Sequence, residues 1–270
     1  MTSIIEKWFD LLNLPTEWKD EVMNSAKTFD PAYIDAKEEP YSWLFEQEDK
    51  KQALLYALCK CEDFYLTAKK RDIPDDILLA SLTEVKRYAL EYYNLTKGEK
   101  IGIQTIKWIG KILNGNIYRL GRLEFEIRTC VYGWPKHNIA AEENVIAVHI
   151  PDNGGPFTEE ACNEAYRLSK EFFAKYFPEY DYKAYVCSSW MLDPTLKQFL
   201  KPTSNIVRFM NTFDVVKTTE AYSSLIFLFG RGTEISDLKN ITPTTSLQKS
   251  VIDHLLSGGK MYSGYGFKEL

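Results

Sequence analysis

The hydrophobic positions of the first 115 residues recur with the spacing of α-helices. Residues 50–70 form one apolar stripe, made by Leu54, Ala57, Leu58, Cys61 and Tyr65. Residues 74–93 and 101–113 repeat this spacing, in which side chains three and four positions apart share one helix face. A turn-forming Asn-Gly pair follows at 114–115. We therefore predict a helical part that ends near residue 115.

From residue 117 onward the pattern is that of strands alternating with helices. Residues 123–128 alternate apolar and charged side chains, which predicts a half-exposed strand with Glu124, Glu126 and Arg128 on its outer face. The nearly continuous apolar run 145–150 is typical of a central strand. The remaining pattern predicts a helix at 157–176, a strand at 182–192, two short helices within 193–213, a strand at 223–229 and a helix at 246–256.

These two patterns predict an α+β protein with two domains. Residues 1–115 form a helical domain, and residues 116–270 form a mixed-sheet α/β domain with helices on both faces. The chain has no internal repeat and no long linker between the two parts.

The charge distribution excludes some classes of partner. Residues 1–115 carry 16 Lys and Arg against 20 Asp and Glu, and residues 116–270 carry 17 against 18. Neither half has the basic excess of a nucleic-acid-binding protein. No apolar run reaches the length of a membrane span, and the amino-terminal segment lacks the basic start of a signal peptide. We therefore expect no nucleic-acid partner and no membrane partner.

The cysteines indicate the compartment. There are five of them, and they are scattered along the chain, which favours reduced thiols in the cytoplasm. Cys59 and Cys61 lack the spacing of a metal-binding pair, and no further Cys or His lies near them in the sequence. We expect a cytoplasmic protein without a metal site.

The loop after the central strand is the first candidate for a binding site. Gly154 and Gly155 follow the strand, and Thr158 is positioned to cap the next helix. Glycines let a backbone approach a ligand closely, and a helix N-terminus attracts phosphate. The alternative is a simple turn from strand to helix, because Glu159 and Glu160 already place negative charge at that helix end.

Two residues near this loop are candidates for catalysis. His149, at the end of the strand, is a candidate general base or, alternatively, a half-buried structural histidine. Cys187 with His149 and Asp193 is a candidate nucleophilic group. Asp193 has a second explanation, because an Asp directly before Pro194 is typical of a helix start.

Several phrases of the sequence resemble one protein family. They are YRLGRLEF at 118–125, HIP at 149–151, PFTEEAC at 156–162, CSSWMLDP at 187–194, SN at 204–205, TSLQ at 245–248 and HLLSGG at 254–259. Together they resemble bacterial acyltransferase-domain proteins, which combine an N-acyltransferase N-terminal helical domain with a GNAT-like C-terminal domain. The resemblance covers nearly the whole chain and is clearest from Tyr118 onward.

A GNAT-like fold implies a place for acetyl-CoA or another acyl-CoA as co-substrate. Its pantetheine arm would lie where the strands 145–150 and 182–192 separate, and its diphosphate on the loop 152–157. The family's loop usually begins with Arg or Gln, and this loop does not. The implied cofactor-binding residues are Ile150, Asn153, Gly154, Gly155 and Thr158.

The resemblance implies an acyl-CoA-dependent N-acyltransferase that acts on the amine of a small molecule or peptide. Direct attack of an amine on a thioester requires a base, a donor for the thioester oxygen and an acid for the thiolate. His149 is the implied base, backbone N–H groups near Ile150 are the donor, and Tyr185 is the acid, with Tyr182 as its alternative. Two other functions stay open: a catalytically silent GNAT-like binding or regulatory module, and a cysteine hydrolase that uses Cys187.

Overall fold

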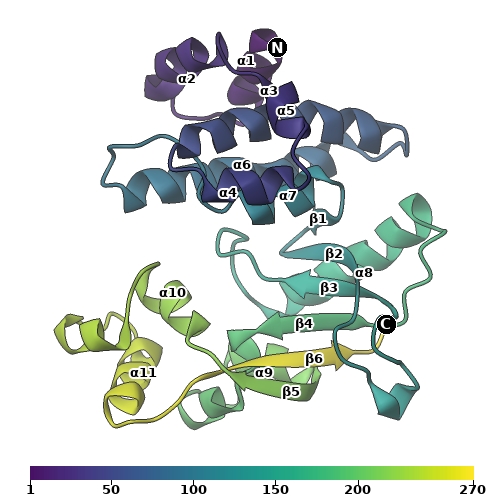
Figure 1. The fold of residues 1–270 in the computed structure, drawn as a ribbon. Helices are drawn as coiled ribbons and strands as arrows, with labels where there is room; N and C mark the ends of the chain where they lie inside the picture. Colours follow the sequence, from purple (N-terminus) through teal and green to yellow (C-terminus); the bar gives the residue numbers. More distant parts are fainter. The chain divides into compact units, whose positions relative to one another are not determined.

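The computed structural model describes residues 1–270, and its contacts divide the chain into two compact units, Met1–Leu120 and Gly121–Leu270. The sequence pattern predicts this division after residue 115. The difference is the short strand β1 (Ile117–Leu120), which packs on helices of the first unit. Figure 1 draws the first unit in purple to teal and the second in teal to yellow.

The first unit is a bundle of helices. They are α1 (Thr2–Leu11), η1 (Thr16–Trp18), α2 (Lys19–Ala26), α3 (Pro31–Asp35), α4 (Pro40–Glu46), α5 (Lys50–Lys69), α6 (Asp75–Leu95) and α7 (Ile106–Leu113). Helix α5 contacts α1, α4, α6 and α7 and carries much of the buried core. The helices predicted at 50–70 and 74–93 are confirmed, and the segment predicted at 101–113 is helical only from Ile106.

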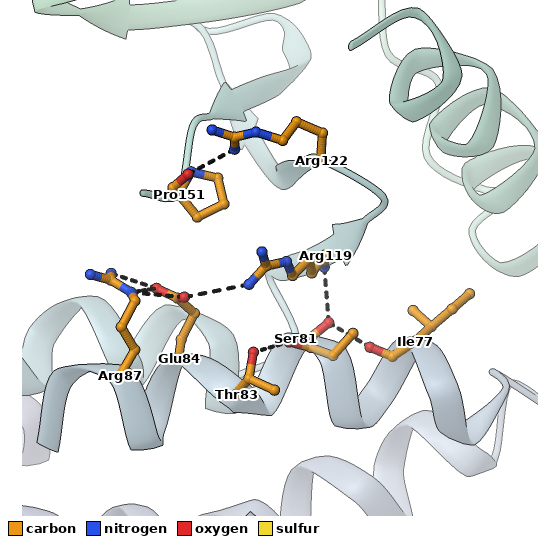
Figure 2. Close-up of polar contacts among 9 residues, drawn as sticks. Ile77, Ser81, Thr83, Glu84, Arg87, Arg119, Arg122 and Pro151 are labelled. Atoms are coloured by element: carbon orange, nitrogen blue, oxygen red, sulfur yellow. Dashed lines mark hydrogen bonds and ion pairs between the residues drawn. The ribbon is translucent and has the colours of Figure 1, made fainter. Parts of the chain in front are cut away.

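A buried carboxylate joins α6 to β1. Glu84 on α6 is fully buried and accepts two hydrogen bonds from Arg87, Nε to Oε1 at 2.9 Å and Nη2 to Oε2 at 2.6 Å. Arg119 of β1 has its Nη1 3.8 Å from Glu84 Oε1, and its backbone N–H donates to Ser81 Oγ at 2.9 Å (Figure 2). A buried charge is tolerated when it is paired. Glu84 and Ser81 therefore hold the end of the first unit against α6.

The second unit contains five strands of the sheet, in the order β2-β3-β4-β6-β5. They are β2 (Leu123–Thr129), β3 (Asn144–His149), β4 (Tyr185–Ser189), β5 (Asp214–Glu220) and β6 (Tyr262–Lys268). Strands β3 and β4 are parallel, and the other three neighbouring pairs are antiparallel. A helical part followed by a mixed sheet with helices confirms the predicted α+β class.

Several helices of the second unit begin at a capping side chain. The helices of this unit are α8 (Glu159–Tyr176), α9 (Asn205–Asn211), α10 (Ser223–Phe229), α11 (Ser246–Leu256) and the 3-10 helices η2 (Pro135–His137), η3 (Trp190–Leu192), η4 (Pro194–Gln198) and η5 (Ile235–Asn240). The side chains of Thr158, Asp193 and Ser204 cap α8, η4 and α9 by accepting backbone N–H bonds. No helix in either unit combines the length and the apolar character needed to cross a membrane.

The two faces of the sheet are covered differently. Because side chains alternate along a strand, Phe125 and Tyr185 lie on one face, and both contact side chains of α8. Ala147 and Val186 lie on the other face, where Trp134 from the segment before β3 completes a buried apolar cluster. These are called the α8 face and the Trp134 face below.

Three parts of the sheet domain differ from the prediction. Residues 223–229 form the helix α10, so the strand predicted there is wrong. A high β propensity expresses how well side chains pack on a sheet, and seven residues are too few for periodicity to separate helix from strand. Strands β5 and β6 are not predicted by the pattern, because β5 is exposed along most of its length and β6 contains two glycines.

The charged side of β2 is the third difference. The sequence pattern predicts that Glu124 and Glu126 face solvent, and the structure buries both. Only Thr129, at the end of the strand, is exposed. The alternation of β2 therefore separates an apolar face from a buried polar face, and buried carboxylates need partners.

Replacing Glu84 by Gln is expected to destabilise the first unit, because Arg87 and Arg119 then lose their buried counter-charge. Removal of one partner of a buried ion pair costs about 3 kcal/mol of the free energy of unfolding. Urea unfolding followed by circular dichroism measures this change. Asp76→Asn is the matched control, since Asp76 is an exposed carboxylate on the same helix. Equal losses in the two variants would contradict the role of Glu84.

Candidate functional site

His149 lies where two parallel strands end. It is the last residue of β3, and β4 runs beside β3 in the same direction. Ligands of α/β sheets bind outside the carboxyl ends of such strands. The loop that leads to α8 begins at this same point. The edge of the sheet that contains His149 is therefore the candidate site.

Strands β3 and β4 separate after a short stretch of pairing. Their register has two pairs, Ile146↔Tyr185 and Ala147↔Val186. Strand β4 continues to pair with β6 as far as Ser189, and β3 continues to pair with β2 as far as His149. A ligand between the separated ends can hydrogen-bond to their backbones, as an added strand would. This is the separation that the family resemblance implies.

The side chain of His149 is bonded to Glu126. His149 Nε2 and Glu126 Oε2 are 2.8 Å apart, and both residues lie on the Trp134 face, on neighbouring strands. Arg128 Nη1 lies 3.9 Å from the same carboxylate oxygen. The sequence pattern predicts a role for His149 and none for Glu126, because their proximity depends on the register between β2 and β3.

Tyr185 lies on the opposite face of the sheet from His149. It is fully buried, its hydroxyl oxygen is 2.6 Å from Ser169 Oγ on α8, and burial raises its pKa. The structure therefore does not bring the two predicted catalytic residues together. Tyr182 is also near Tyr185, with the two ring centroids 6.2 Å apart.

The cysteine hydrolase is excluded by the geometry. Cys187 lies on the α8 face and is fully buried, and this burial raises its pKa to about 12. His149, on the other face, cannot take its proton. Asp193 instead accepts backbone N–H bonds from Thr195 at 2.8 Å and from Tyr262 at 2.7 Å. Its role is the structural one that the Asp-Pro pair indicates.

The loop after β3 is supported by an arginine from outside it. Arg122, directly before β2, is buried and donates from Nη1 to the carbonyl oxygen of Pro151 at 2.7 Å (Figure 2). A methyl group added at Gly154 would come within 2.4 Å of that Nη1, so only glycine fits against the guanidinium. Gly155 has a φ of +77° and open space around it. The loop thus lacks its own Arg or Gln, and the guanidinium of Arg122 places a positive charge against Pro151 and Gly154.

The N-terminus of α8 is occupied by its own side chains. Thr158 Oγ1 accepts from the Ala161 N–H at 3.2 Å. Hydrogen bonds with its own backbone N–H and with Thr158 lower the pKa of Glu160. Glu159 Oε2 pairs with Nη1 of Arg208 on α9 at 3.0 Å. The side chains of Thr158 and Glu160 therefore bind part of this helix end, and unbonded donors remain in the loop before it.

The amides of the two loop glycines are such donors. No hydrogen bond within the protein uses the backbone N–H of Gly154 or Gly155. Consecutive amides in a turn with one left-handed residue form a concave anion site. Together with Arg122, they give this loop the chemistry needed to hold a phosphate.

A cleft between α8 and α9 opens beside the loop. It is lined by Phe157, Thr158, Glu159, Cys162, Asn163, Tyr166, Asn205, Arg208, Phe209 and Thr212. Tyr166 is buried, and its hydroxyl has no hydrogen-bond partner in the protein. Burial raises the pKa of this phenol well above its ordinary value, so it keeps its proton. A buried hydroxyl without a partner requires an explanation, and a ligand bound in this cleft would provide one.

The structure offers no group of three or more His, Cys, Asp or Glu side chains that could hold a metal ion. All five cysteines are free of disulfide bonds. Cys61 lies within the core of α5, where burial raises the pKa of its thiol well above the ordinary value.

The predicted site residues thus fall into two groups. Ile150, Asn153, Gly154, Gly155 and Thr158 form one continuous segment directly after His149. Tyr185 lies apart from them on the α8 face. The sequence pattern does not predict the roles of Glu126, Arg122 and Tyr166. Only Arg122 had a visible signal, since it lies in the phrase 118–125 that carries the family resemblance.

Several solved structures share this fold. An acyltransferase in complex with decanoyl-CoA and teicoplanin is 23% identical in sequence and has a TM-score of 0.77. A mutant acyltransferase in complex with octanoyl-CoA is 22% identical and has the same TM-score of 0.77. Each of these two alignments covers 98% of this chain and 87% of the other chain. A comparison with curated proteins found no match.

The sequence itself matches a family in its second part. The model of the GNAT-like C-terminal domain matches residues 117–268, which is more than half of the chain. This region includes every strand of the sheet, the loop after β3 and the helix α8. The chain therefore belongs to the family with a GNAT-like C-terminal domain.

Proposed function

We propose that this protein is an acyl-CoA-dependent N-acyltransferase that acts on the amine of a small molecule or peptide. The observation that carries the proposal is the coincidence of three features at one edge of the sheet. Strands β3 and β4 separate there, the unbonded amides of Gly154 and Gly155 lie next to the buried Arg122, and His149 stands at the end of β3. The fold shared with acyltransferases that bind acyl-CoA supports it.

The diphosphate of acyl-CoA is assigned to the loop after β3. The amides of Gly154 and Gly155 donate to its oxygens, with the backbone of Asn153 and the hydroxyl of Thr158 beside them. Arg122 contributes positive charge from below through a buried side chain, where charge is weakly screened.

The thioester is assigned to the opening between β3 and β4. The backbone N–H of Ile150 donates to the thioester oxygen, which becomes negative during attack. His149 accepts the proton of the attacking amine. Its side chain keeps 23% of its surface exposed, so an acceptor and water both have access to it.

Tyr166 is a better donor to the departing thiolate than Tyr185. The Tyr185 hydroxyl is already bonded to Ser169, whereas the Tyr166 hydroxyl lacks a partner and lines the cleft beside the loop. Tyr166 also contacts β4, because its ring packs edge-to-face on that of Tyr185 with the centroids 5.0 Å apart. Because its pKa is raised by burial, the phenol stabilises the thiolate by a hydrogen bond and keeps its proton.

The proposal includes a chemical class of acceptor and a chemical class of acyl donor. The neighbouring acyltransferases bind decanoyl-CoA, octanoyl-CoA and, in one case, teicoplanin, which supports an acyl-CoA co-substrate and a small-molecule acceptor here. The reaction is assigned to the cytoplasm on the five free thiols.

Gly155→Ala is expected to weaken acyl-CoA binding at least fivefold, because the new side chain disturbs the backbone turn that presents the amides. Gly232→Ala is the matched control. Both glycines have positive φ, +77° and +88°, with no atom near the new methyl, so both variants lose about 1 kcal/mol of the free energy of unfolding. Isothermal titration with acetyl-, octanoyl- and decanoyl-CoA measures the binding.

These titrations separate the two functions that the sequence left open. A ligand with a Kd of 100 μM stabilises the protein by ~1.4 kcal/mol at 1 mM, which a thermal melt detects. Absence of any shift with all three acyl-CoAs would refute the proposal. Binding without transfer to any amine would favour the silent binding module. Equal acyl-CoA affinities of Gly155→Ala and Gly232→Ala would show that the diphosphate does not bind to this loop.

Tyr166→Phe is expected to lower kcat about tenfold and to leave the stability of the fold unchanged or higher, because it removes a buried hydroxyl that has no partner. Tyr185→Phe should do the reverse. It breaks the buried bond to Ser169, which costs about 1 kcal/mol of the free energy of unfolding, and leaves kcat near that of the wild type. Thioester cleavage and urea unfolding are measured on both variants. A large fall of kcat in Tyr185→Phe alone would restore Tyr185 as the acid.

A further inference from the structure

We infer that Glu126 is the positioning residue of the proposed reaction and that it makes Nδ1 of His149 the atom that accepts the proton. This inference rests on the proposed acyl transfer. It goes beyond that proposal because it names the partner of the base, the tautomer of the imidazole and the nitrogen that reacts.

The sheet geometry brings the two side chains together. Glu126 is directly opposite Ala147 in the register, and His149 is two residues further along β3, so the pair is diagonal on the Trp134 face. Long side chains bridge such a diagonal. The Glu126 side chain is 7% exposed, while that of His149 is 23% exposed. The carboxylate is therefore the fixed partner, and the imidazole reaches from it toward solvent.

The contact determines which nitrogen carries the hydrogen. Nε2 is the nitrogen that lies 2.8 Å from Glu126 Oε2. An ionised carboxylate only accepts hydrogen bonds, so Nε2 carries the hydrogen and donates it. A neutral imidazole has one N–H, which leaves the lone pair on Nδ1. Without this bond, both tautomers would be populated and the ring would rotate about its χ2 angle.

The same carboxylate has an electrostatic effect during the reaction. The amine nitrogen bonds to the thioester carbon, its proton passes to Nδ1, and the carbon–sulfur bond breaks to release CoA as a thiolate, which later takes a proton from water. The imidazole is positive until it returns its proton to water. Glu126 stabilises that positive charge through the Nε2 bond.

Two other charged side chains lie near Glu126 and His149 on the Trp134 face. Glu124 is directly opposite His149 in the register and is buried, and Arg128 lies 3.9 Å from Glu126. A change at Glu126 removes two contacts of one carboxylate oxygen, the bond to His149 and the ion pair with Arg128. The tautomer of His149 reports on the first of these two contacts alone.

The first experiment reads the tautomer directly. The chain has three histidines, so ¹⁵N-histidine labelling gives a spectrum that His149→Gln assigns. We expect an Nε2–H tautomer for His149 at neutral pH in the wild type and a mixture of tautomers in Glu126→Ala. An Nδ1–H tautomer in the wild type, or an unchanged spectrum in the variant, would overturn the inference. This readout does not depend on finding the acceptor.

The second experiment compares turnover in matched variants. Glu126→Gln is expected to lower kcat between tenfold and 100-fold and to leave KM for acyl-CoA within twofold, because a partner of the base, not a binding contact, has changed. Glu143→Gln is the control. It removes the same charge at the start of β3, where Glu143 accepts a bond from the Ala140 amide. Equal kcat in Glu126→Gln and the wild type would refute the positioning role.

The two experiments also separate this inference from the proposed function. If no amine is acylated while the wild-type histidine shows the Nε2–H tautomer, the acyl transfer is wrong and Glu126 still fixes the imidazole. If amines are acylated and kcat is insensitive to Glu126, the transfer stands and the positioning residue is wrong. Urea unfolding of Glu126→Gln excludes a loss of folded protein as the cause of a lower rate.

Discussion

The short pairing between β3 and β4 is the constraint on which the rest of the second unit depends. Two register pairs hold these parallel strands together, and beyond them the strands part. Each strand nevertheless keeps a complete hydrogen-bonded neighbour, β2 for β3 and β6 for β4. A sheet can therefore open at this one point without losing the order of either strand. The loop, the helix α8 and His149 all start from this opening, because they follow directly from the end of β3.

Buried charges around β2 complete the site from outside the loop. Burial of a charged group is costly unless it is paired, so each of these groups has a defined partner. Glu126 is held by His149 and Arg128, and Arg122 by the carbonyl of Pro151. This loop has neither Arg nor Gln at the position where the family's loop usually has one. A positive charge reaches the loop instead from Arg122, the residue before β2. A motif defined on the loop alone cannot detect a charge that the fold supplies from another segment.

The sequence predicts those features that depend on residues close together in the chain. The caps at Thr158 and Asp193 depend on bonds over two or three positions, and both predictions are confirmed. The strand predicted at 223–229 is wrong, because its run of five apolar residues is compatible with both a helix and a strand, and the contacts of α10 with η3 are made with another part of the chain. The pair of Glu126 and His149 is separated by 23 positions. Their contact depends on strand register, which no local pattern contains, and the buried polar side of β2 was therefore missed.

The two side chains proposed to act in the reaction lie on opposite faces of the sheet. His149 is on the Trp134 face and Tyr166 is on the side of α8, with the opening of the strands between them. The base acts on the amine nitrogen and the phenol on the sulfur, which are attached to the same carbonyl carbon during the transfer. Placing the base and the phenol on opposite faces keeps the imidazole bonded to Glu126 and leaves the phenol without a partner until a thiolate arrives. The cost of that unpaired hydroxyl in the free protein is the physical reason to look for a ligand in the cleft that Tyr166 lines.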